Sequence, residues 1–593
     1  MSENSLELHL PDRSAVSDGS FATTPNELNS WLKRLPLADA GESSRQIFEA
    51  IFELNRLDIP HLARIKIAEL FLQPVAYLSD NLKKCYLELA FPLSEKNRKI
   101  ALLDRELHAE LAISYKLIID QLIRVKKRRS DRKLLVIAIH RAIRCLSRVL
   151  YRSVVVYEPY PQGTWNELHG LFAYAEKNQI LDLPVKEAEE NSENATIGDL
   201  YGQILLFSIS SPYRLRQKEI EYIQLQLPAW ARLTSLGRLK PHAQSIGLFI
   251  TRLDSDLPPI HRDLQSGGIE KGCRELNTRR LVQWLGETLD HPPLKRPAGE
   301  NLGVDERAVK QLNRQMIQAF STMRKRKFLR TQLDCELINV VGIPALHATL
   351  NAKKLARVKE TESQSSPQEQ EFDWFQPPHN RPLINTMLYT SEESTAYKLM
   401  HLDGGEQNLS NPRGVDHLTQ HKNQPSYWAI DSEEVVAEPF SCTTVNQSAN
   451  GYCIRWQGSD APRLRVGEIL GIQSASDQNI FNIGVSRWLK HIPGVGLSVG
   501  MELISPSAAP VSARLSDASD HTQPPREGLL LPELKTSNRP ATLILPAIPF
   551  KTGDQLSIDD GSRERQVRLT RLLESTGSFA HFQFDQLDDG RTE

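Results

Sequence analysis

The sequence predicts a multidomain α+β protein whose first half is α-helical and whose second half is rich in β-strands. At 593 residues the chain is long enough for about three or four domains of ordinary size. Hydrophobic residues make up 40% and charged residues 24%, which is typical of a folded globular protein. Helical periodicity dominates up to about residue 180, whereas β-branched and alternating segments dominate after Thr331.

Residues 1–23 are polar and are expected to form a mobile tail, and residues 24–228 an α-helical domain. Thr24-Pro25-Asn26-Glu27 has the composition of a helix start, with a capping residue, a proline in the first turn and an acidic residue. Two long amphipathic patterns follow, from about 98 to 126 and from about 131 to 151. Long helices joined by short breaks predict a helical bundle.

Residues 229–303 are expected to be a mixed α/β segment. Ser245–Arg252 is apolar and β-branched, and Pro258-Pro259 and Gly267-Gly268 mark turns after it. An amphipathic helix from about 305 to 323 then leads into the β-rich half.

Two segments of that half carry the residues with the most specific chemistry. Arg326-Lys327-Phe328-Leu329-Arg330 ends the lead-in helix and precedes a predicted strand, Thr331–Val341. Two guanidinium groups four residues apart suit phosphate oxygens and stack on purine bases. Far downstream, Asn446 and Ser448 share one face of an extended segment, and Gly451 permits a close backbone approach or a positive φ.

Together the two segments resemble the PilZ family, small antiparallel β-barrels that bind cyclic di-GMP through an Arg-x-x-x-Arg segment and an Asp/Asn-x-Ser-x-x-Gly turn. Three later segments resemble the remaining strands of that family, namely Val466–Leu470, Ile483–Trp488 and Val499–Leu503. The resemblance implies a PilZ-like barrel within 304–516, lead-in helix included. The residues that the resemblance implies as binding cyclic di-GMP are Arg326, Arg330, Asn446, Ser448 and Gly451.

One departure from the family pattern concerns the distance between the two motifs, because residues 352–425 intervene as a long insertion. The alternative is that the first motif is accidental. The arginines would then be cations at a helix C-terminus, and Asn446–Gly451 an ordinary β-turn. After the barrel, 517–526 is expected to be a linker and 527–593 a second small β unit.

The remaining composition excludes several classes of protein. The formal net charge of −1 argues against general attraction to nucleic acid or anionic membranes. The six cysteines have no metal-ligand spacing, and no P-loop, HExxH motif or identifiable catalytic set is present, so we expect no metal, no cofactor and no enzymatic activity. With neither a secretory signal nor an apolar run of ~18 residues, the expected location is the cytoplasm.

The sequence therefore predicts a cyclic di-GMP receptor that relays the signal through its helical half to a protein partner in motility, pilus or surface-behaviour control. We expect the joint at Arg326–Arg330 to be mobile without ligand and to close on the Asn446 turn when ligand binds. One alternative is a scaffold protein with a degenerate barrel. A third is nucleic-acid binding by the basic helices 124–152, where four arginines form one stripe: Arg141, Arg144, Arg148 and Arg152.

Overall fold

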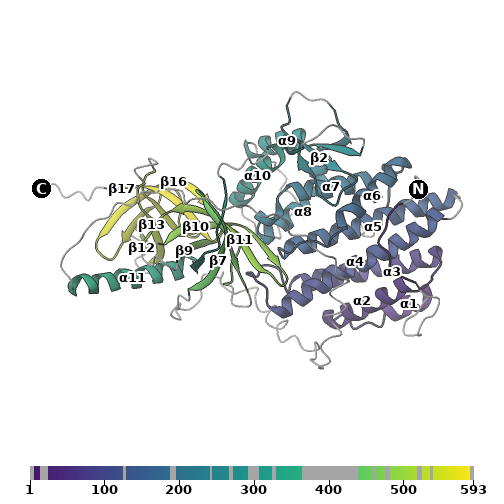
Figure 1. Ribbon diagram of the computed structural model, residues 1–593, viewed down its shortest axis with the longest axis horizontal. Coiled ribbons are helices and arrows are strands. Elements are labelled where there is room, and N and C mark those ends of the chain that lie inside the picture. The colour runs from purple at the N-terminus through teal and green to yellow at the C-terminus, as the bar shows by residue number, and fades with distance from the viewer. Residues whose placement is uncertain are drawn as a thin grey trace.

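The computed structural model describes residues 6–13, 24–124, 129–186, 195–240, 244–265, 272–290, 306–322, 329–363, 439–457, 462–474, 481–516, 524–534 and 539–587. Helices gather at the N-terminal side of the molecule and two β-barrels at the C-terminal side, with a small sheet lying beside the helices (Figure 1). None of the described helices combines the length and the apolar character needed to cross a membrane.

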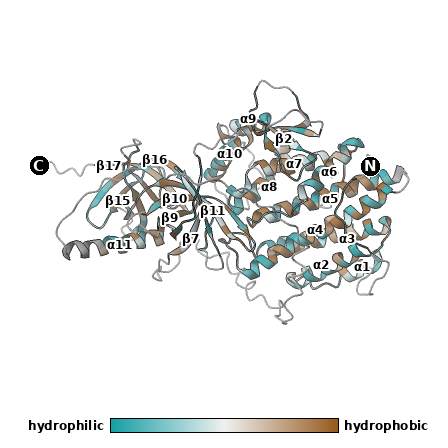
Figure 2. Cartoon of the chain, viewed as in Figure 1, coloured by the Kyte–Doolittle hydropathy of each residue, from teal (hydrophilic) through white to brown (hydrophobic). Residues whose placement is uncertain are grey.

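The helical domain contains eight α-helices among the described residues. They are α1 (Pro25–Leu32), α2 (Ala40–Arg56), α3 (His61–Lys83), α4 (Glu95–Arg124), α5 (Arg129–Val155), α6 (Thr164–Lys177), α7 (Ile197–Ile209) and α8 (Gln217–Ala231), with a 3-10 turn η1 (Pro212–Arg214) between the last two. The predicted helix start is confirmed, since the Thr24 side chain accepts a hydrogen bond from Glu27 N. In Figure 2, brown and teal alternate along many elements, as expected for helices and strands with one buried face.

Part of the predicted mobile tail, residues 6–13, lies against the helical domain. Leu6 and Leu8 pack on its core, and His9 N donates to Glu167 Oε1 at 3.0 Å. Residues 1–5 and 14–23 lie outside the described part of the chain.

Two of the four stripe arginines are buried on α5 rather than presented to solvent. Arg141 is 3% exposed and its Nε lies 3.2 Å from Glu69 Oε1. Arg152 is 4% exposed, and its Nε lies 3.1 Å from the fully buried Asp104. Because phosphate binding needs accessible cations, this packing argues against the nucleic-acid alternative.

The mixed segment forms a four-stranded antiparallel sheet in the order β1-β4-β2-β3. Its elements are β1 (Ser235–Arg238), β2 (Leu248–Arg252), β3 (Ile260–His261), the 3-10 turn η2 (Arg262–Leu264), β4 (Cys273–Asn277), α9 (Arg279–Asp290) and α10 (Glu306–Ser321). The lead-in helix α10 belongs to this unit rather than to the barrel, since Thr278 Oγ1 donates to Phe320 O at 2.6 Å and Gly247 N to Ser321 O at 2.8 Å.

The first barrel is an antiparallel sheet in the order β5-β7-β6-β9-β10-β11-β8, closed by pairing of β7 with β8. The strands are β5 (Thr331–Gln332), β6 (Glu336–Val341), β7 (Phe440–Ser448), β8 (Gly451–Trp456), β9 (Ile469–Ser474), β10 (Asn482–Ile492) and β11 (Gly496–Ser505). The predicted strand Thr331–Val341 is thus two strands. The helix α11 (Ile343–Ser363) occupies the start of the predicted insertion, and residues 364–438 lie outside the described part of the chain.

The second barrel is closed in the order β12-β13-β14-β17-β16-β15. Its strands are β12 (Ala509–Leu515), β13 (Arg526–Leu531), β14 (Thr542–Pro546), β15 (Gln555–Asp559), β16 (Glu564–Ser575) and β17 (Phe579–Gln586). Since β12 pairs with β13 and β15, this barrel begins at 509, earlier than the expected 527. The helix α11 packs against both barrels, and apolar residues of all three share one core cluster, including Leu346, Ile483 and Leu529.

The helical domain packs on the first barrel. Helical-domain residues and barrel residues such as Leu470 and Val499 belong to one continuous hydrophobic cluster. Phe91 and Leu464 exchange two backbone hydrogen bonds of 2.8 Å, and His491 N donates to Tyr157 O at 2.8 Å. Residues 323–328, at the expected joint itself, lie outside the described part of the chain.

Candidate nucleotide-binding site

The Asn446–Gly451 motif forms the tight hairpin between β7 and β8. Ser448 pairs with Gly451, so only Ala449 and Asn450 make the turn, and Ser448 Oγ donates to Gly451 O at 3.3 Å. A Cβ at Gly451 would lie 2.1 Å from Met501 O on β11. The glycine is therefore required by the close approach of the neighbouring strand, one of the two reasons expected from the sequence.

The short strand β5 brings Arg330 to this hairpin. Thr331 pairs with Gln447 and Gln332 with Asn446, so Arg330, one residue earlier, lies at the Ser448 end of β7. Burial raises the pKa of the Cys453 thiol on β8, and the positive charges of Arg330 and Arg455 oppose that rise. Arg330 is exposed and makes no ion pair with any described residue.

Four of the five residues expected from the sequence therefore converge, namely Arg330, Asn446, Ser448 and Gly451. Arg326 lies among residues 323–328, outside the described part of the chain. Their role in binding stays a prediction, although segments far apart in the sequence meet at one place.

These residues lie on the exterior of the barrel. Residues directly opposite one another in antiparallel strands share a face, and pairing places Asn446, Cys453 and Gly500 in one row. The alternate residues Ile454 and Val499 are 0% exposed and form the interior. The site is thus an outer surface of the sheet rather than a cavity within the barrel.

Trp488 completes this row on β10, where it pairs with Gly500. A Cβ at Gly500 would lie 1.8 Å from Trp488 Nε1, so the indole occupies the space above the glycine. The row therefore runs from the Trp488 ring across Gly500 and the Cys453 thiol to the Asn446 amide. Such a surface can accept a planar base against an aromatic face.

A second exterior row, Lys490, Ser498 and Arg455, adds two cations. Arg455 Nε donates to Ser498 Oγ at 3.2 Å, which leaves its terminal nitrogens for other acceptors. Arg455, Trp488 and Lys490 were not among the residues expected from the sequence. The alternation from Gly451 through Cys453 indicates Arg455, because every second residue of a strand shares a face.

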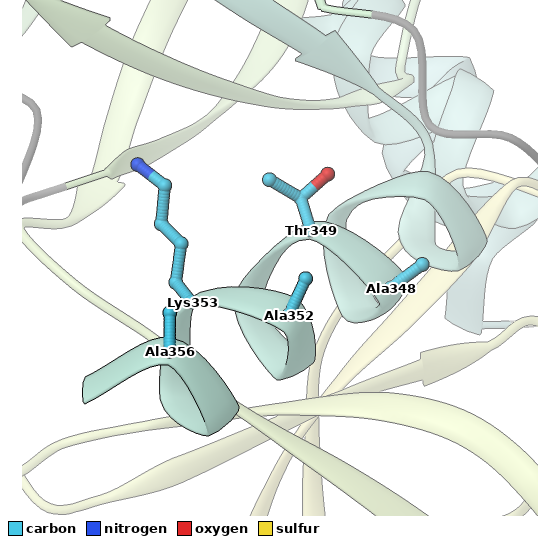
Figure 3. A pocket seen from close by; sticks show the side chains of 5 residues that line it. All are labelled: Ala348, Thr349, Ala352, Lys353 and Ala356. Atoms are coloured by element: carbon cyan, nitrogen blue, oxygen red, sulfur yellow. The ribbon is translucent and has the colours of Figure 1, made fainter. Parts of the chain in front are cut away.

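A separate hollow of about 500 Å³ lies on α11, lined by Ala348, Thr349, Ala352, Lys353 and Ala356 (Figure 3). Its described lining offers one cation, Lys353, whose Nζ donates to Gln473 Oε1 at 2.8 Å and lies 4.4 Å from the centre of the Phe481 ring. This hollow lacks the paired cations and amides of the hairpin surface. Within the described residues, no group of three or more His, Cys, Asp or Glu side chains could hold a metal ion.

The first barrel is closed and antiparallel, and it carries an arginine beside an Asn-x-Ser-x-x-Gly hairpin on its outer face, as expected of a PilZ domain; a PilZ-domain model matches this part of the chain. Residues 248–510 match the model described as "Cyclic-di-GMP receptor FimW, middle PilZ domain". Residues 26–242 match the N-terminal domain of the same receptor and residues 511–587 its C-terminal β-barrel domain.

Comparison with curated proteins gives the same relationship. The chain is 29% identical over 584 residues to the cyclic-di-GMP receptor FimW of Pseudomonas aeruginosa, covering 98% of this chain and 93% of that protein. No solved structure matches the chain.

Proposed function

We propose that this protein is a receptor that binds cyclic di-GMP on the outer face of its first barrel, and that its activity is binding rather than catalysis. The observation that carries the proposal is the convergence of Arg330, Asn446 and Ser448 on one exterior face. The similarity to a cyclic-di-GMP receptor over nearly the whole chain supports the same ligand.

Each residue type matches one part of a cyclic dinucleotide. Arg330, together with Arg326, supplies guanidinium groups for the phosphates and for stacking on guanine. The Asn446 amide makes no hydrogen bond to a described residue, so its donor and acceptor are available for a base edge. Trp488 offers a stacking surface, and Arg455 a further phosphate partner.

The downstream role that we propose is control of motility, pili or surface behaviour through a protein partner that contacts the helical domain. We place the receptor in the cytoplasm, where its six free cysteines stay reduced. The runner-up is a scaffold protein whose barrel no longer binds nucleotide. The two differ in one measurable property, which is affinity for cyclic di-GMP.

Calorimetric titration of the full chain with cyclic di-GMP tests the proposal. Removing both guanidinium groups in Arg326→Ala/Arg330→Ala takes away several charge-assisted hydrogen bonds of roughly 1.5–3 kcal/mol each, so the affinity should fall by more than a hundredfold. The matched control is Arg571→Ala, an exposed arginine of the second barrel without an ion-pair partner among the described residues. No binding by the wild-type chain would favour the scaffold, and equal binding by the double variant would remove the two arginines from the proposed site.

A further inference from the structure

Arg487 occupies a β-bulge next to the candidate site. In the pairing of β10 with β11, Ser486 faces Met501 and Trp488 faces Gly500, so Arg487 has no partner in the ladder. A bulge inserts one residue into a strand and redirects side chains on either side of it. Here it places Trp488 on the candidate nucleotide-binding face.

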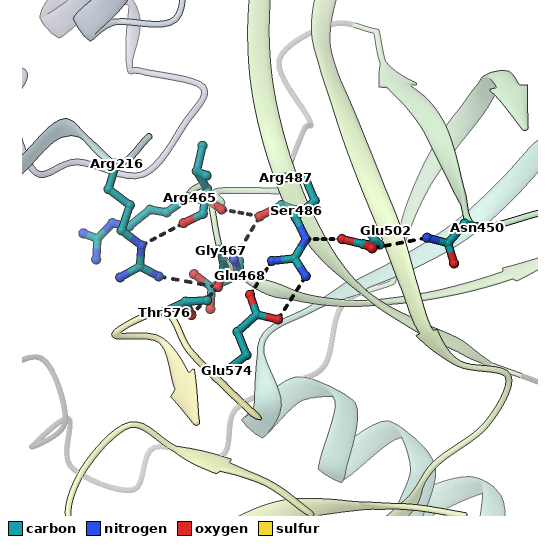
Figure 4. A network of polar contacts seen from close by, with 11 residues as sticks. Arg216, Asn450, Arg465, Gly467, Glu468, Ser486, Arg487, Glu502, Glu574 and Thr576 are labelled. Carbon is teal, nitrogen blue, oxygen red and sulfur yellow. Dashed lines mark hydrogen bonds and ion pairs between the residues drawn. The ribbon is translucent and has the colours of Figure 1, made fainter. Parts of the chain in front are cut away.

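One side of the Arg487 guanidinium is connected to the turn of the nucleotide-binding hairpin by hydrogen bonds through Glu502. Arg487 Nε donates to Glu502 Oε2 at 2.7 Å, and Glu502 Oε1 accepts from Asn450 Nδ2 at 3.2 Å. Leu503 N also donates to Asn450 O at 3.0 Å. Asn450 is one of the two turn residues between Ser448 and Gly451, so these contacts strap the turn to β11 (Figure 4).

The other side of the guanidinium is held by the second barrel. Both terminal nitrogens of Arg487 donate to the two carboxylate oxygens of Glu574, a bidentate ion pair in which the side chains are only 26% and 21% exposed. Two parallel charge-assisted bonds fix both the distance and the orientation of the partners. The hairpin turn and the second barrel are thereby joined through Glu502, Arg487 and Glu574 (Figure 4).

Glu574 begins the tip of the β16–β17 hairpin, and we name residues 574–579 the finger. Thr576 Oγ1 donates to Gly467 O at 2.7 Å, and Ser578 Oγ donates to Glu468 Oε2 at 3.2 Å on the first barrel. Arg216 of the helical domain donates to Ser578 Oγ at 2.8 Å and to Val466 O at 2.9 Å. The finger of the second barrel is therefore docked where the helical domain meets the first barrel.

We infer that the finger of the second barrel is a positioning element for nucleotide binding, so that docking of this barrel and occupancy of the site are coupled. This inference rests on the proposed function. Glu574 holds Arg487, Arg487 holds Glu502, and Glu502 holds the turn of the hairpin that carries Asn446 and Ser448 beside β5 and Arg330. Since coupling between two binding events is reciprocal, ligand bound at the hairpin also stabilises the docked finger.

Two measurements on the full chain test this coupling. Glu574→Gln keeps the shape of the side chain but removes its charge and one of its two carboxylate acceptors. In calorimetry, its affinity for cyclic di-GMP should be at least fivefold lower than that of the wild type, which is the lower end of typical coupling between sites. Arg571→Ala, three residues earlier on the same strand, should bind like the wild type. In hydrogen exchange on the wild-type chain, cyclic di-GMP should slow exchange in the finger, and Glu574→Gln should reduce that slowing.

The outcomes separate the inference from the proposed function. If the wild-type chain does not bind cyclic di-GMP, the proposed function fails and the inference fails with it. If the wild type binds but Glu574→Gln binds equally well or more tightly, only the coupling is refuted. Unchanged exchange in the wild-type finger on ligand addition refutes it without the use of a variant, so a folding defect in the variant cannot obscure the answer.

Discussion

Replacement of Gly451 by alanine is the sharpest single test of the hairpin geometry. The new Cβ would lie 2.1 Å from Met501 O, 3.1 Å from Met501 C and 3.2 Å from Glu502 Cα, all of them backbone atoms that cannot rotate away. Ordinary contact begins near 3.4 Å, so β8 and β11 must separate by about 1.3 Å at this point. The clash can be relieved only by moving the hairpin.

The cost follows from the bonds that such a movement breaks. Backbone hydrogen bonds at the Gly451–Glu502 pair and from Leu503 N to Asn450 O would lengthen beyond useful range, as would the side-chain bond from Asn450 Nδ2 to Glu502 Oε1. At about 0.5–1.5 kcal/mol for each bond, the barrel should lose roughly 2–4 kcal/mol of stability. The Asn446 and Ser448 side chains would also be displaced from Arg330, and affinity for cyclic di-GMP should fall at least tenfold.

Urea unfolding and calorimetry of the same preparation measure the two effects. The control is Gly494→Ala in the turn before β11, where the added Cβ meets nothing within 4 Å. Its φ of +76° still costs about 1–2 kcal/mol with a side chain, but the binding surface stays unchanged. Wild-type affinity in a folded Gly451→Ala variant would show that the hairpin geometry does not determine binding.

Three further predictions follow. Trp488→Leu should weaken cyclic di-GMP binding by about 1–3 kcal/mol in calorimetry if the indole stacks on a base, and unchanged affinity would remove Trp488 from the site. Burial lowers the pKa of His140 to about 3, so the free energy of unfolding should fall once the pH drops below about 6.5, by about 2 kcal/mol at pH 5. The urea midpoint measures this loss, and in His140→Leu the part of its shift that comes from His140 should be absent. Because Arg141 and Arg152 are buried, binding to DNA at physiological salt should be weak, and submicromolar affinity lost in Arg144→Ala/Arg148→Ala would contradict this.

Local patterns were sufficient to predict many elements and the shared face of Asn446 and Ser448. The capping residue Thr24 marks a true helix start, because its hydroxyl accepts a hydrogen bond from the free backbone N–H of Glu27. Asn446 and Ser448 share a face because alternate residues of a regularly paired strand do, and the pairing is regular between these two residues. These features depend on a few neighbouring residues, which the sequence contains in full.

Local alternation does not predict the face of β10 on which Trp488 lies, because a bulge at Arg487 intervenes. Strict alternation puts Trp488 on the same side as Ser486, which pairs with the interior residue Met501. The unpaired Arg487 shifts the register by one and moves the indole to the exterior. A bulge depends on contacts with another strand, here β11, so no local pattern indicates it.

The two covers of β9 likewise depend on parts of the chain that are distant in sequence. Ile469 and Leu470 are adjacent and 1% and 0% exposed, although their side chains point to opposite faces of the sheet. Leu470 belongs to the core shared with the helical domain, and Ile469 to the core shared with α11 and the second barrel. The apolar sequence indicates that both faces are covered, but not which parts of the chain cover them.

These shared cores change the route by which a ligand could act on the rest of the protein. Swinging the helical domain away from the barrel would expose Phe91, Leu464 and Val466, which are 2%, 1% and 6% exposed. At roughly 1.5–3 kcal/mol for each side chain, this alone costs about as much as the roughly 5.5 kcal/mol that converts a mostly closed population into a mostly open one. Within the finger, Glu574, Thr576 and Ser578 are held by polar contacts, and water can replace these at lower cost than it can cover apolar side chains. We therefore expect cyclic di-GMP to change the polar contacts of the finger before it changes the position of the helical domain.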